Sequence, residues 1–487
     1  MRQLQSDDPA TVAHKTVHVA LPLLTSDVPY VTILWLDDDI LFDIFNCYRL
    51  DDEYLWNVRF RWSKLSHVCR RWRNLIYQST SHLGMHIQCT NGSPILDTLD
   101  HLPPLPLFVN YGYTSVTMTE KDELGLIHAL RLRDRVRHID LDLPPPAVLH
   151  KVLLLMDEQF PILEHLSLSF ATKNSIPLTL PKAFRAPNLR HLDLVGLGLP
   201  KRLRLLTSAV SLVTLHLSNI ETSSYFRPRL LAARLQSLPQ LQELSIDFSI
   251  PIPRPSAERE LLGEKGTSVT LPNLQTLRFK GVSAYLESFV AQIGVPLLEW
   301  LVITLFNQIT FSLPHLSRLI NITEESKLPA SRVYFDPNEV SIITARHGSP
   351  WFDPAPLLLR VTCTQLAWQI DCAAQICNAL IPALSGVERI ALRCSHDFQI
   401  PTALENGAID SRVWHELLRS FIGVKELDIP DKLLEELSRA LQVDEVGWDP
   451  GFLPNLRSNN AADNVFTAFI DTRRVIGRPV RFSQRRY

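Results

Sequence analysis

The sequence predicts a mixed α/β protein in which a small helical module precedes a long, irregular solenoid. Three observations lead to this prediction: a short leucine pattern recurs along the middle of the chain, apolar residues fall at helical spacing within residues 28–90, and a proline-rich segment separates the two regions. Repeats decide the fold because one unit cannot bury its apolar face alone and must stack on its neighbours.

Composition limits the functional classes. A chain of 487 residues is long enough for about three domains, or for one extended domain plus a small module. The 49 Lys and Arg residues are balanced by 51 Asp and Glu residues, whereas a body built for nucleic acid or anionic membranes needs a basic excess. With 17 glycines, the chain is also too poor in glycine to suggest a glycine-loop nucleotide fold.

Cysteine usage and the N-terminal segment predict an intracellular protein, cytoplasmic and/or nuclear. The seven cysteines are odd in number and include no C-x-x-C pair, which favours free thiols in a reducing compartment. Residues 1–20 are too charged for a signal peptide, and no apolar run reaches the ~18 residues of a membrane span. We therefore expect no membrane partner.

The chain divides into five predicted parts. Residues 1–27 form a weakly ordered lead-in, and residues 28–90 form the helical module. Residues 91–130 form a joint that contains Leu102-Pro-Pro-Leu-Pro-Leu107, and residues 131–455 form the solenoid. Residues 456–487 form a basic tail.

The recurring pattern is Leu-x-x-Leu-x-Leu. Its last two apolar residues alternate with polar ones, which is typical of a short strand that buries one face. First positions lie 23 to 33 residues apart between residues 136 and 298. Six strong copies begin at Leu163, Leu189, Leu212, Leu241, Leu274 and Leu298, and weaker copies begin at Val136, Val387 and Val424. The pattern resembles leucine-rich repeats, which have a period of about 20–29 residues; ordinary strands of a sandwich are the alternative.

The repeat departs from that family in two ways. The Asn or Cys that usually follows the last leucine is missing, and 89 residues separate the copies at Leu298 and Val387. Within this gap, residues 332–335, 340–344 and 357–362 predict strands. Residues 251–270, between the copies at Leu241 and Leu274, predict a loop. We therefore expect an irregular solenoid with variable helices, such as one around residues 151–158.

Two apolar stripes define the helical module. The first stripe falls on one face of a helix that has acidic residues in its first turn, and the second belongs to a further helix. Two short helices make a small core, so we expect a partner to cover the remaining apolar surface. The stripes comprise Leu36, Ile40, Leu41, Ile44 and Phe45, and then Leu65, Val68, Cys69, Trp72, Leu75 and Ile76.

Both stripes together resemble an F-box, whose pattern is Leu-Pro-x-Glu-Ile-Leu-x-x-Ile-Phe followed by Leu-x-x-Val-Cys-x-x-Trp. The chain departs at Asp37, Asp39 and a long connector, residues 51–63. The long connector and the segment 469–480 are similar to large fungal F-box families with leucine-rich repeats. The resemblance implies an adaptor that binds the Skp-type linker of a cullin–RING ubiquitin ligase and recruits a protein substrate.

The resemblance also implies which residues bind the linker, with Trp72 as the strongest single contact. The alternative is that these side chains only pack on one another. The implied set is Leu36, Ile40, Leu41, Ile44, Phe45, Leu65, Val68, Cys69 and Trp72.

The polar residues between strand leucines are the predicted substrate-binding surface, because they face the side of a solenoid that the helices leave open. The alternative is a solvated sheet face. Their charge drifts from acidic to basic along the array. The set comprises His165, Ser167, Ser169, His191, Asp193, Thr214, His216, Ser218, Glu243, Ser245, Asp247, Thr276, Arg278 and Lys280.

The sequence offers little chemistry of its own. It contains no H-E-x-x-H, Walker loop or G-x-S-x-G motif, so we expect no enzyme activity, cofactor or metal. Residues 56–62 combine Trp, Phe and Arg in a pattern that can hold single strands, but we favour packing under the helices and expect no nucleic-acid partner. The arginines of the basic tail suggest a nuclear address or, more simply, a solvated terminus; they are Arg473, Arg474, Arg478, Arg481, Arg485 and Arg486.

The predicted function is substrate recruitment for ubiquitin transfer. One alternative is a leucine-rich-repeat scaffold that binds proteins without a ligase, and another is a hydrolase with a dispersed Ser/His/Asp set. The sequence does not identify the substrate.

Overall fold

The computed structural model divides into two compact units, Met1–Gly84 and Met85–Tyr487. Predictions for residues 1–27 and 56–60, and for most of 251–270, lie outside the described residues. The structure describes residues 36–50, 61–78, 86–92, 95–99, 104–112, 118–170, 178–199, 204–221, 224–251, 268–322, 330–345, 356–397, 411–441, 453, 455–456, 458–459, 467–475, 477 and 479–482.

The first unit contains three helices: α1 (Asp38–Leu50), α2 (Arg61–Ser66) and α3 (Arg70–Gln78). Asp38 and Asp39 occupy the first turn of α1, where the helix dipole favours negative charge. Among the described residues of this unit, the buried apolar side chains are Leu41, Phe45, Trp72 and Ile76.

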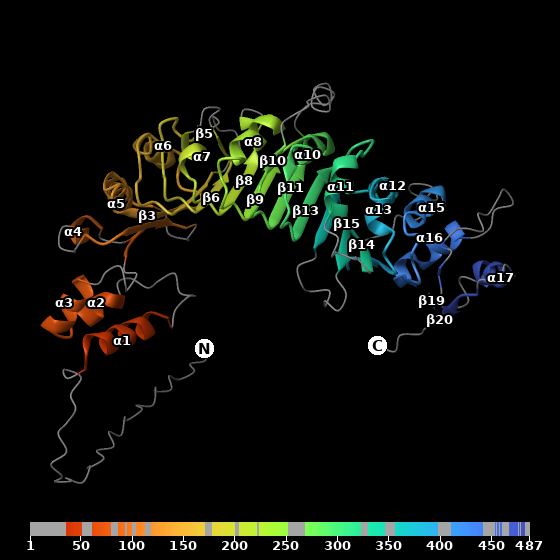
Figure 1. The fold of residues 1–487 in the computed structure, drawn as a ribbon, viewed down its shortest axis with the longest axis horizontal. Coiled ribbons are helices and arrows are strands. Elements are labelled where there is room, and N and C mark those ends of the chain that lie inside the picture. The colour runs from red at the N-terminus through yellow and green to blue at the C-terminus, as the bar shows by residue number, and fades with distance from the viewer. Residues whose placement is uncertain are drawn as a thin grey trace, which may run out of the picture. The chain divides into compact units, whose positions relative to one another are not determined.

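The second unit is built on one large sheet, so the predicted mixed α/β class is confirmed (Figure 1). Among the described residues, sixteen strands belong to it. In spatial order they are β1 (Ile87–Thr90), β2 (Leu107–Tyr111), β3 (Val136–Leu141), β4 (His165–Ser169), β6 (His191–Val195), β8 (Thr214–Ile220), β9 (Glu243–Phe248), β11 (Thr276–Gly281), β13 (Trp300–Phe306), β16 (Leu357–Thr362), β15 (Glu339–Ala345), β14 (Ala330–Asp336), β17 (Arg389–Cys394), β18 (Glu426–Asp428), β19 (Ser458–Asn459) and β20 (Arg481–Phe482).

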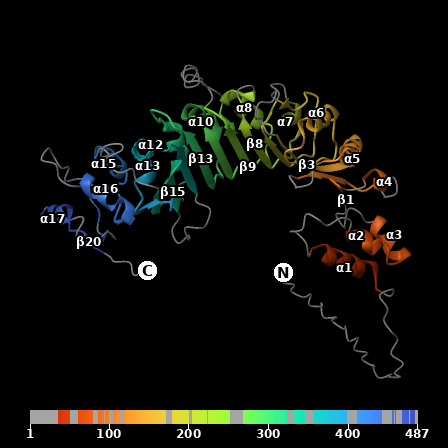
Figure 2. The ribbon, with the colours of Figure 1, turned by 180° about the vertical axis from the view of Figure 1, so that it is seen from behind.

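Helices connect most of these strands. Figures 1 and 2 show α5, α6, α8 and α10 on the same side of the sheet in both views, and we call the opposite side the open face. The helices of this unit are α4 (Ile95–Leu99), α5 (Glu120–Arg131), α6 (Pro146–Leu155), α7 (Arg204–Ser208), α8 (Pro228–Leu235), α10 (Ser283–Val290), α11 (Pro314–Ile322), α12 (Leu366–Ala379), α13 (Ile381–Leu384), α15 (Ser411–Arg419), α16 (Asp431–Leu441) and α17 (Thr467–Val475). Two small parallel pairs accompany them: β5 (Leu178–Thr179) with β7 (Leu197–Gly198), and β10 (Val269–Thr270) with β12 (Ile293–Gly294).

The leucine pattern places one strand of the large sheet in each of its nine copies. Successive strands pair in parallel and in register, so that equivalent leucines form a continuous buried row. This register follows from the pattern, because a strand exposes alternate residues to opposite faces and a slip by one residue would turn every leucine outward. One such row comprises Leu166, Leu192, Leu215, Leu244, Leu277 and Leu301.

The long gap between repeats is filled by an antiparallel insertion. The three strands predicted there exist as β14, β15 and β16, and β15 runs antiparallel to both neighbours. The insertion keeps the sheet continuous, because β16 pairs in parallel with β13 and β14 pairs in parallel with β17.

The predicted joint, residues 91–130, is wrong as a separate part. It contains α4, β2 and α5, and β2 pairs in parallel with β1 and β3. Pro104 and Pro106 precede β2 instead of interrupting it, and the carbonyl of Pro106 still accepts a hydrogen bond from the Ile87 amide at 2.8 Å. Thr119 and Asp122 form a capping box that begins α5.

The predicted basic tail is also part of the sheet. Strands β19 and β20 pair in parallel with each other, and β19 pairs with β18. Arg474 on α17 pairs with Asp471 at 3.0 Å. Residues 458–459 and 481–482 of the predicted tail are therefore strands of the large sheet.

None of the helices that the structure describes is both long and apolar enough to cross a membrane.

A buried carboxylate ties two helices of the second unit together. Glu287 on α10 is 1% exposed, and its two oxygens accept the amides of His315 at 2.8 Å and Leu316 at 3.0 Å. These amides lie in the first turn of α11, where an α-helix leaves its N–H groups without partners. Burial raises the pKa of Glu287, and the two backbone donors oppose that rise.

We predict that Glu287→Ala lowers the free energy of unfolding by roughly 3 kcal/mol, because it leaves two buried amides without acceptors. Urea denaturation followed by circular dichroism measures this change. Glu299→Ala removes an exposed glutamate and should change stability by no more than about 0.5 kcal/mol. Equal losses for the two variants would show that Glu287 has no capping role.

Candidate protein-binding surfaces

The first apolar stripe of the small unit divides into a buried part and an exposed part. Leu41 and Phe45 are buried, whereas Ile40 is 46% exposed and Ile44 is 36% exposed. The division follows from helical geometry, because Ile40 and Ile44 are four residues apart and share one side of α1. That side therefore presents apolar surface to solvent.

The second stripe divides in the same way. Trp72 is 6% exposed, and its ring lies edge-on to Phe45 with the two centroids 4.9 Å apart. Val68, in the turn before α3, is 56% exposed, and Leu36, Leu65 and Cys69 are half-buried. Trp72 thus belongs to the core of this unit, and the exposed apolar positions are Ile40, Ile44 and Val68.

An arginine on α3, Arg71, joins two helices of the first unit. The Arg71 guanidinium donates to Asp38 Oδ1, at 2.6 Å from Nη2 and 3.2 Å from Nε, and to the Leu36 carbonyl at 2.6 Å. The group therefore ties α3 to the start of α1. No local pattern predicts this contact, because the partners are 33 and 35 residues apart.

Ring side chains form a ladder across the open face of the second unit, over β1 to β6. The centroid separations are 3.8 Å for His86–Phe108, 5.1 Å for Phe108–His138, 4.1 Å for His138–His165 and 5.7 Å for His165–His191. The first three pairs are stacked nearly parallel, and the last is tilted. We call these five residues the ring ladder.

Of the five residues of the ring ladder, the sequence analysis predicted only His165 and His191 on the open face. Phe108 and His138 lie in the same row as His165 and His191, because the strand register pairs Phe108 with His138 and His138 with His165. The available signal was the weak repeat copy at Val136, in which His138 occupies a polar position. Phe108 was missed because its strand was assigned to the joint.

Burial favours the neutral form of three imidazoles of the ring ladder, those of His138, His165 and His191. Burial, together with the neighbouring His165, His86 and His191, lowers the pKa of His138 to about 3. Burial and adjacent positive charges also lower the pKa of His165 and of His191. Stacked imidazoles disfavour protonation because two adjacent cations repel each other.

A second row lies beside the ring ladder and contains Asp140, Ser167, Asp193 and His216, paired strand by strand. The nearby Asp193 carboxylate raises the pKa of His216, with burial opposing the rise and Glu243 adding to it. His216 Nε2 lies 3.2 Å from Glu243 Oε1, and His216 Nδ1 lies 3.9 Å from Asp193 Oδ2.

The charge of the open face reverses between β9 and β11. Arg278 pairs with Glu243 at 3.2 Å, and Lys280 pairs with Asp247 at 3.2 Å. Beyond this boundary the face carries further basic residues. Arg360 pairs with Glu339 at 3.5 Å, and Arg393 pairs with Asp428. The predicted drift from acidic to basic therefore corresponds to a defined line of ion pairs.

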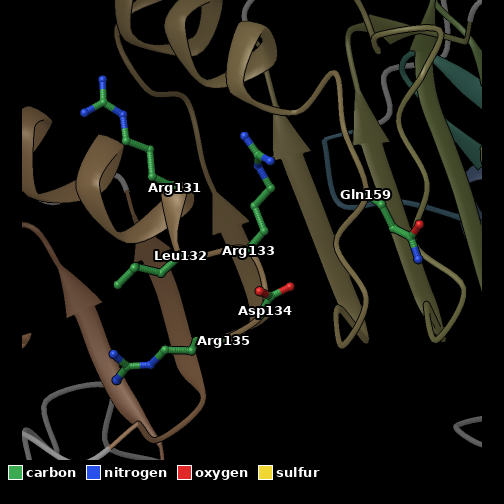
Figure 3. Close-up of a pocket in the computed structure, with 6 residues that line it drawn as sticks. All are labelled: Arg131, Leu132, Arg133, Asp134, Arg135 and Gln159. Atoms are coloured by element: carbon green, nitrogen blue, oxygen red, sulfur yellow. The ribbon is translucent and has the colours of Figure 1, made fainter.

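A hollow of about 270 Å³ lies beside the start of β3, and three arginines are among the residues that line it. Figure 3 shows these residues. The side chains of Arg131, Arg133 and Arg135 point in different directions. Arg133 pairs with Glu158, and Arg135 Nε donates to the Leu105 carbonyl at 3.1 Å. The hollow therefore lacks the convergent donors that an anion site needs.

Metal ligands do not gather in the part of the chain that the structure describes: no three His, Cys, Asp or Glu side chains there could hold a metal ion together. Cys363 and Cys372 are buried, and hydrogen bonding between their thiols raises the pKa of Cys363.

We predict that the ring ladder makes the protein less stable in acid. The unfolded chain takes up protons on these histidines below about pH 6.5, whereas folded His138 does so only near pH 3, so stability falls as the pH drops through this window. His138→Phe should reduce the slope of unfolding free energy against pH between about 6.5 and 4. Urea titrations at several pH values measure the slope.

Two variants control this prediction. His150→Phe replaces an exposed histidine on α6 and should leave the slope unchanged. His216 has a raised folded pKa, so its contribution to stability is full below about pH 6.5 and is lost as the pH rises through the folded value. His216→Gln should therefore weaken the fold more at low pH than at high pH. An unaltered slope in His138→Phe would refute the prediction.

Comparison with protein-family models finds none that matches this chain, and comparison with curated proteins finds no match either.

Proposed function

We propose that this protein is the substrate-recognition adaptor of an SCF-type cullin–RING ubiquitin ligase. In this proposal the first unit is an F-box that binds a Skp-type linker, and through it a cullin. The second unit is an irregular leucine-rich-repeat solenoid whose open face binds a target protein.

The observation that carries the proposal is the exposed apolar side of the first unit. Its core consists of few large side chains, and Ile40, Ile44 and Val68 remain in solvent around it. Exposed apolar residues on so small a unit favour a protein partner, because burying them removes apolar area from water. These three positions also belong to the set that the F-box resemblance implies.

The architecture of the second unit supports the repeat assignment. Each copy of the leucine pattern contributes a strand, and parallel in-register pairing gives each copy contacts mainly with its neighbours. The antiparallel insertion of β14 and β15 and the missing Asn or Cys are departures from the family. They make the array irregular but keep the sheet continuous.

The proposed role requires no bond chemistry from this chain. An adaptor that holds a target on one unit and the ligase on the other raises the effective concentration of the target near the catalytic subunits. Specificity then depends on the side chains of the open face, and assembly with the ligase depends on α1 and the turn before α3.

We predict that the double variant Ile40→Asp and Ile44→Asp weakens binding of a purified Skp-type linker by at least about tenfold, since central interface residues often contribute ~2 kcal/mol. Titration calorimetry with the full chain measures the affinity. Both residues are exposed, so circular dichroism should be unchanged. Leu154→Asp on α6 together with Leu230→Asp on α8 is the matched control, because it places the same two charges at exposed leucines of the other unit.

The result that would reject the proposal is wild-type protein that does not bind the linker, or binding that the double variant leaves intact. If the wild type binds no linker or cullin but still retains other proteins, the alternative of a scaffold without a ligase holds. Trp72→Ala is a poorer test, because Trp72 packs against Phe45 and its truncation disturbs the core of the unit.

A further inference from the structure

The ring ladder and the row of Asp140, Ser167 and Asp193 form two parallel tracks on the open face. The residues of the second row follow those of the ladder by two positions on the same strands, as in His138 and Asp140. Two residues along a strand correspond to about 6.6 Å, so the tracks are separated by roughly the width of one extended chain. Both tracks run across the strands.

Each track offers different chemistry. A neutral imidazole presents one donor and one acceptor at its ring edge, which suits the alternating N–H and C=O groups of a peptide backbone. Burial lowers the pKa of His138, His165 and His191, so these three imidazoles bring no positive charge to this surface at neutral pH. The second track brings the carboxylates of Asp140 and Asp193.

The spacing of the carboxylates selects a particular ligand geometry. Asp140 on β3 and Asp193 on β6 are separated by one intervening strand, β4, and are aligned through Ser167. Two strand spacings amount to about 9.6 Å. Three residues of polyproline II helix rise about 9.3 Å, and they return the side chain to the same face because this helix has three residues per turn. Basic residues at positions i and i+3 therefore match the two carboxylates.

The charges around the tracks define where such a ligand ends. On the β8 side, His216 of the same row lies 3.9 Å from Asp193 and 3.2 Å from Glu243. Beyond it, Glu243 and Asp247 are already paired with Arg278 and Lys280 of β11, which would repel a further cation. On the other side of the ladder, Arg137 pairs with Glu164 at 2.9 Å. These two residues and Arg190 line a hollow of about 240 Å³ beside His138, His165 and His191.

We propose that this surface binds a protein segment in polyproline II conformation that carries an Arg-x-x-Arg or Lys-x-x-Lys motif. The segment runs across β3, β4 and β6, with its backbone over the ring ladder and its two basic side chains on Asp140 and Asp193. The proposal deepens one half of the proposed function, target binding by the open face, and depends on that half only.

The test uses the full chain and a fluorescein-labelled peptide, Gly-Pro-Arg-Pro-Pro-Arg-Pro-Gly, with binding followed by fluorescence anisotropy at low ionic strength. The comparison peptides carry Glu in place of both Arg residues, or place the Arg residues one residue closer together. We expect the Arg-x-x-Arg peptide to bind at least about tenfold more tightly than either comparison peptide.

The variants locate the site. Asp140→Asn with Asp193→Asn should weaken binding at least tenfold, whereas Glu339→Gln with Glu426→Gln removes the same number of charges from the basic half of the face and should change affinity less than twofold. His138→Leu with His165→Leu keeps side-chain volume but removes the ring-edge donors and acceptors, and it should weaken binding at least threefold. Circular dichroism verifies that each variant is folded.

Three results would overturn the proposal. The first is tighter binding of the Glu peptide, which would assign the surface to an acidic segment at Arg137 and Arg190. The second is equal affinity for both Arg spacings, and the third is an equal loss of affinity in the two double carboxylate variants. None of these results bears on linker binding, which is measured separately with Ile40→Asp and Ile44→Asp. Failure of the ligase assignment and failure of the peptide site are therefore distinguishable.

Discussion

The in-register burial of leucines is the interaction on which the rest of the second unit depends. Each strand presents its apolar residues to the helix-covered side, where Leu166, Leu192 and Leu215 continue one row from strand to strand. Because side chains alternate along a strand, fixing this buried row also fixes every polar residue on the opposite side. The ring ladder and the carboxylate row are thus consequences of core packing, since neither could align if one strand slipped by a single residue.

The two units differ in how their apolar surface is covered. In the second unit each repeat covers the next, and even the insertion of β14 and β15 keeps the sheet paired on both sides. The first unit has no such continuation among its described residues, and part of its apolar surface stays in solvent at Ile40, Ile44 and Val68. The proposed division of labour follows: the unit with uncovered apolar residues binds a fixed linker, and the unit with a polar, charge-patterned face binds a target.

Local periodicity predicted the strands of the leucine pattern and the apolar stripes of the first unit, but it did not sort their side chains by role. The stripe of α1 was predicted as one surface, yet Leu41 and Phe45 face Trp72 or other core residues while Ile40 and Ile44 do not. A helix stripe about 100° wide can serve both a core and an interface, and only the position of the neighbouring helix decides which residues do which. Local sequence also failed to predict β2: the prolines near this strand suggested a joint, although Pro104 and Pro106 precede the strand and do not interrupt it.

The sequence by itself determined the mixed α/β class, the strands in all nine copies of the leucine pattern, and the acidic-to-basic drift of the polar positions. These features depend on residues close together in the chain, where spacing is preserved by the backbone. Tertiary structure alone decided that Trp72 lies inside, that Arg71 ties α3 to Asp38, and that His86, Phe108, His138, His165 and His191 stack. Those contacts join residues more than 20 positions apart, and their distances are set by how strands and helices pack, which no local pattern encodes.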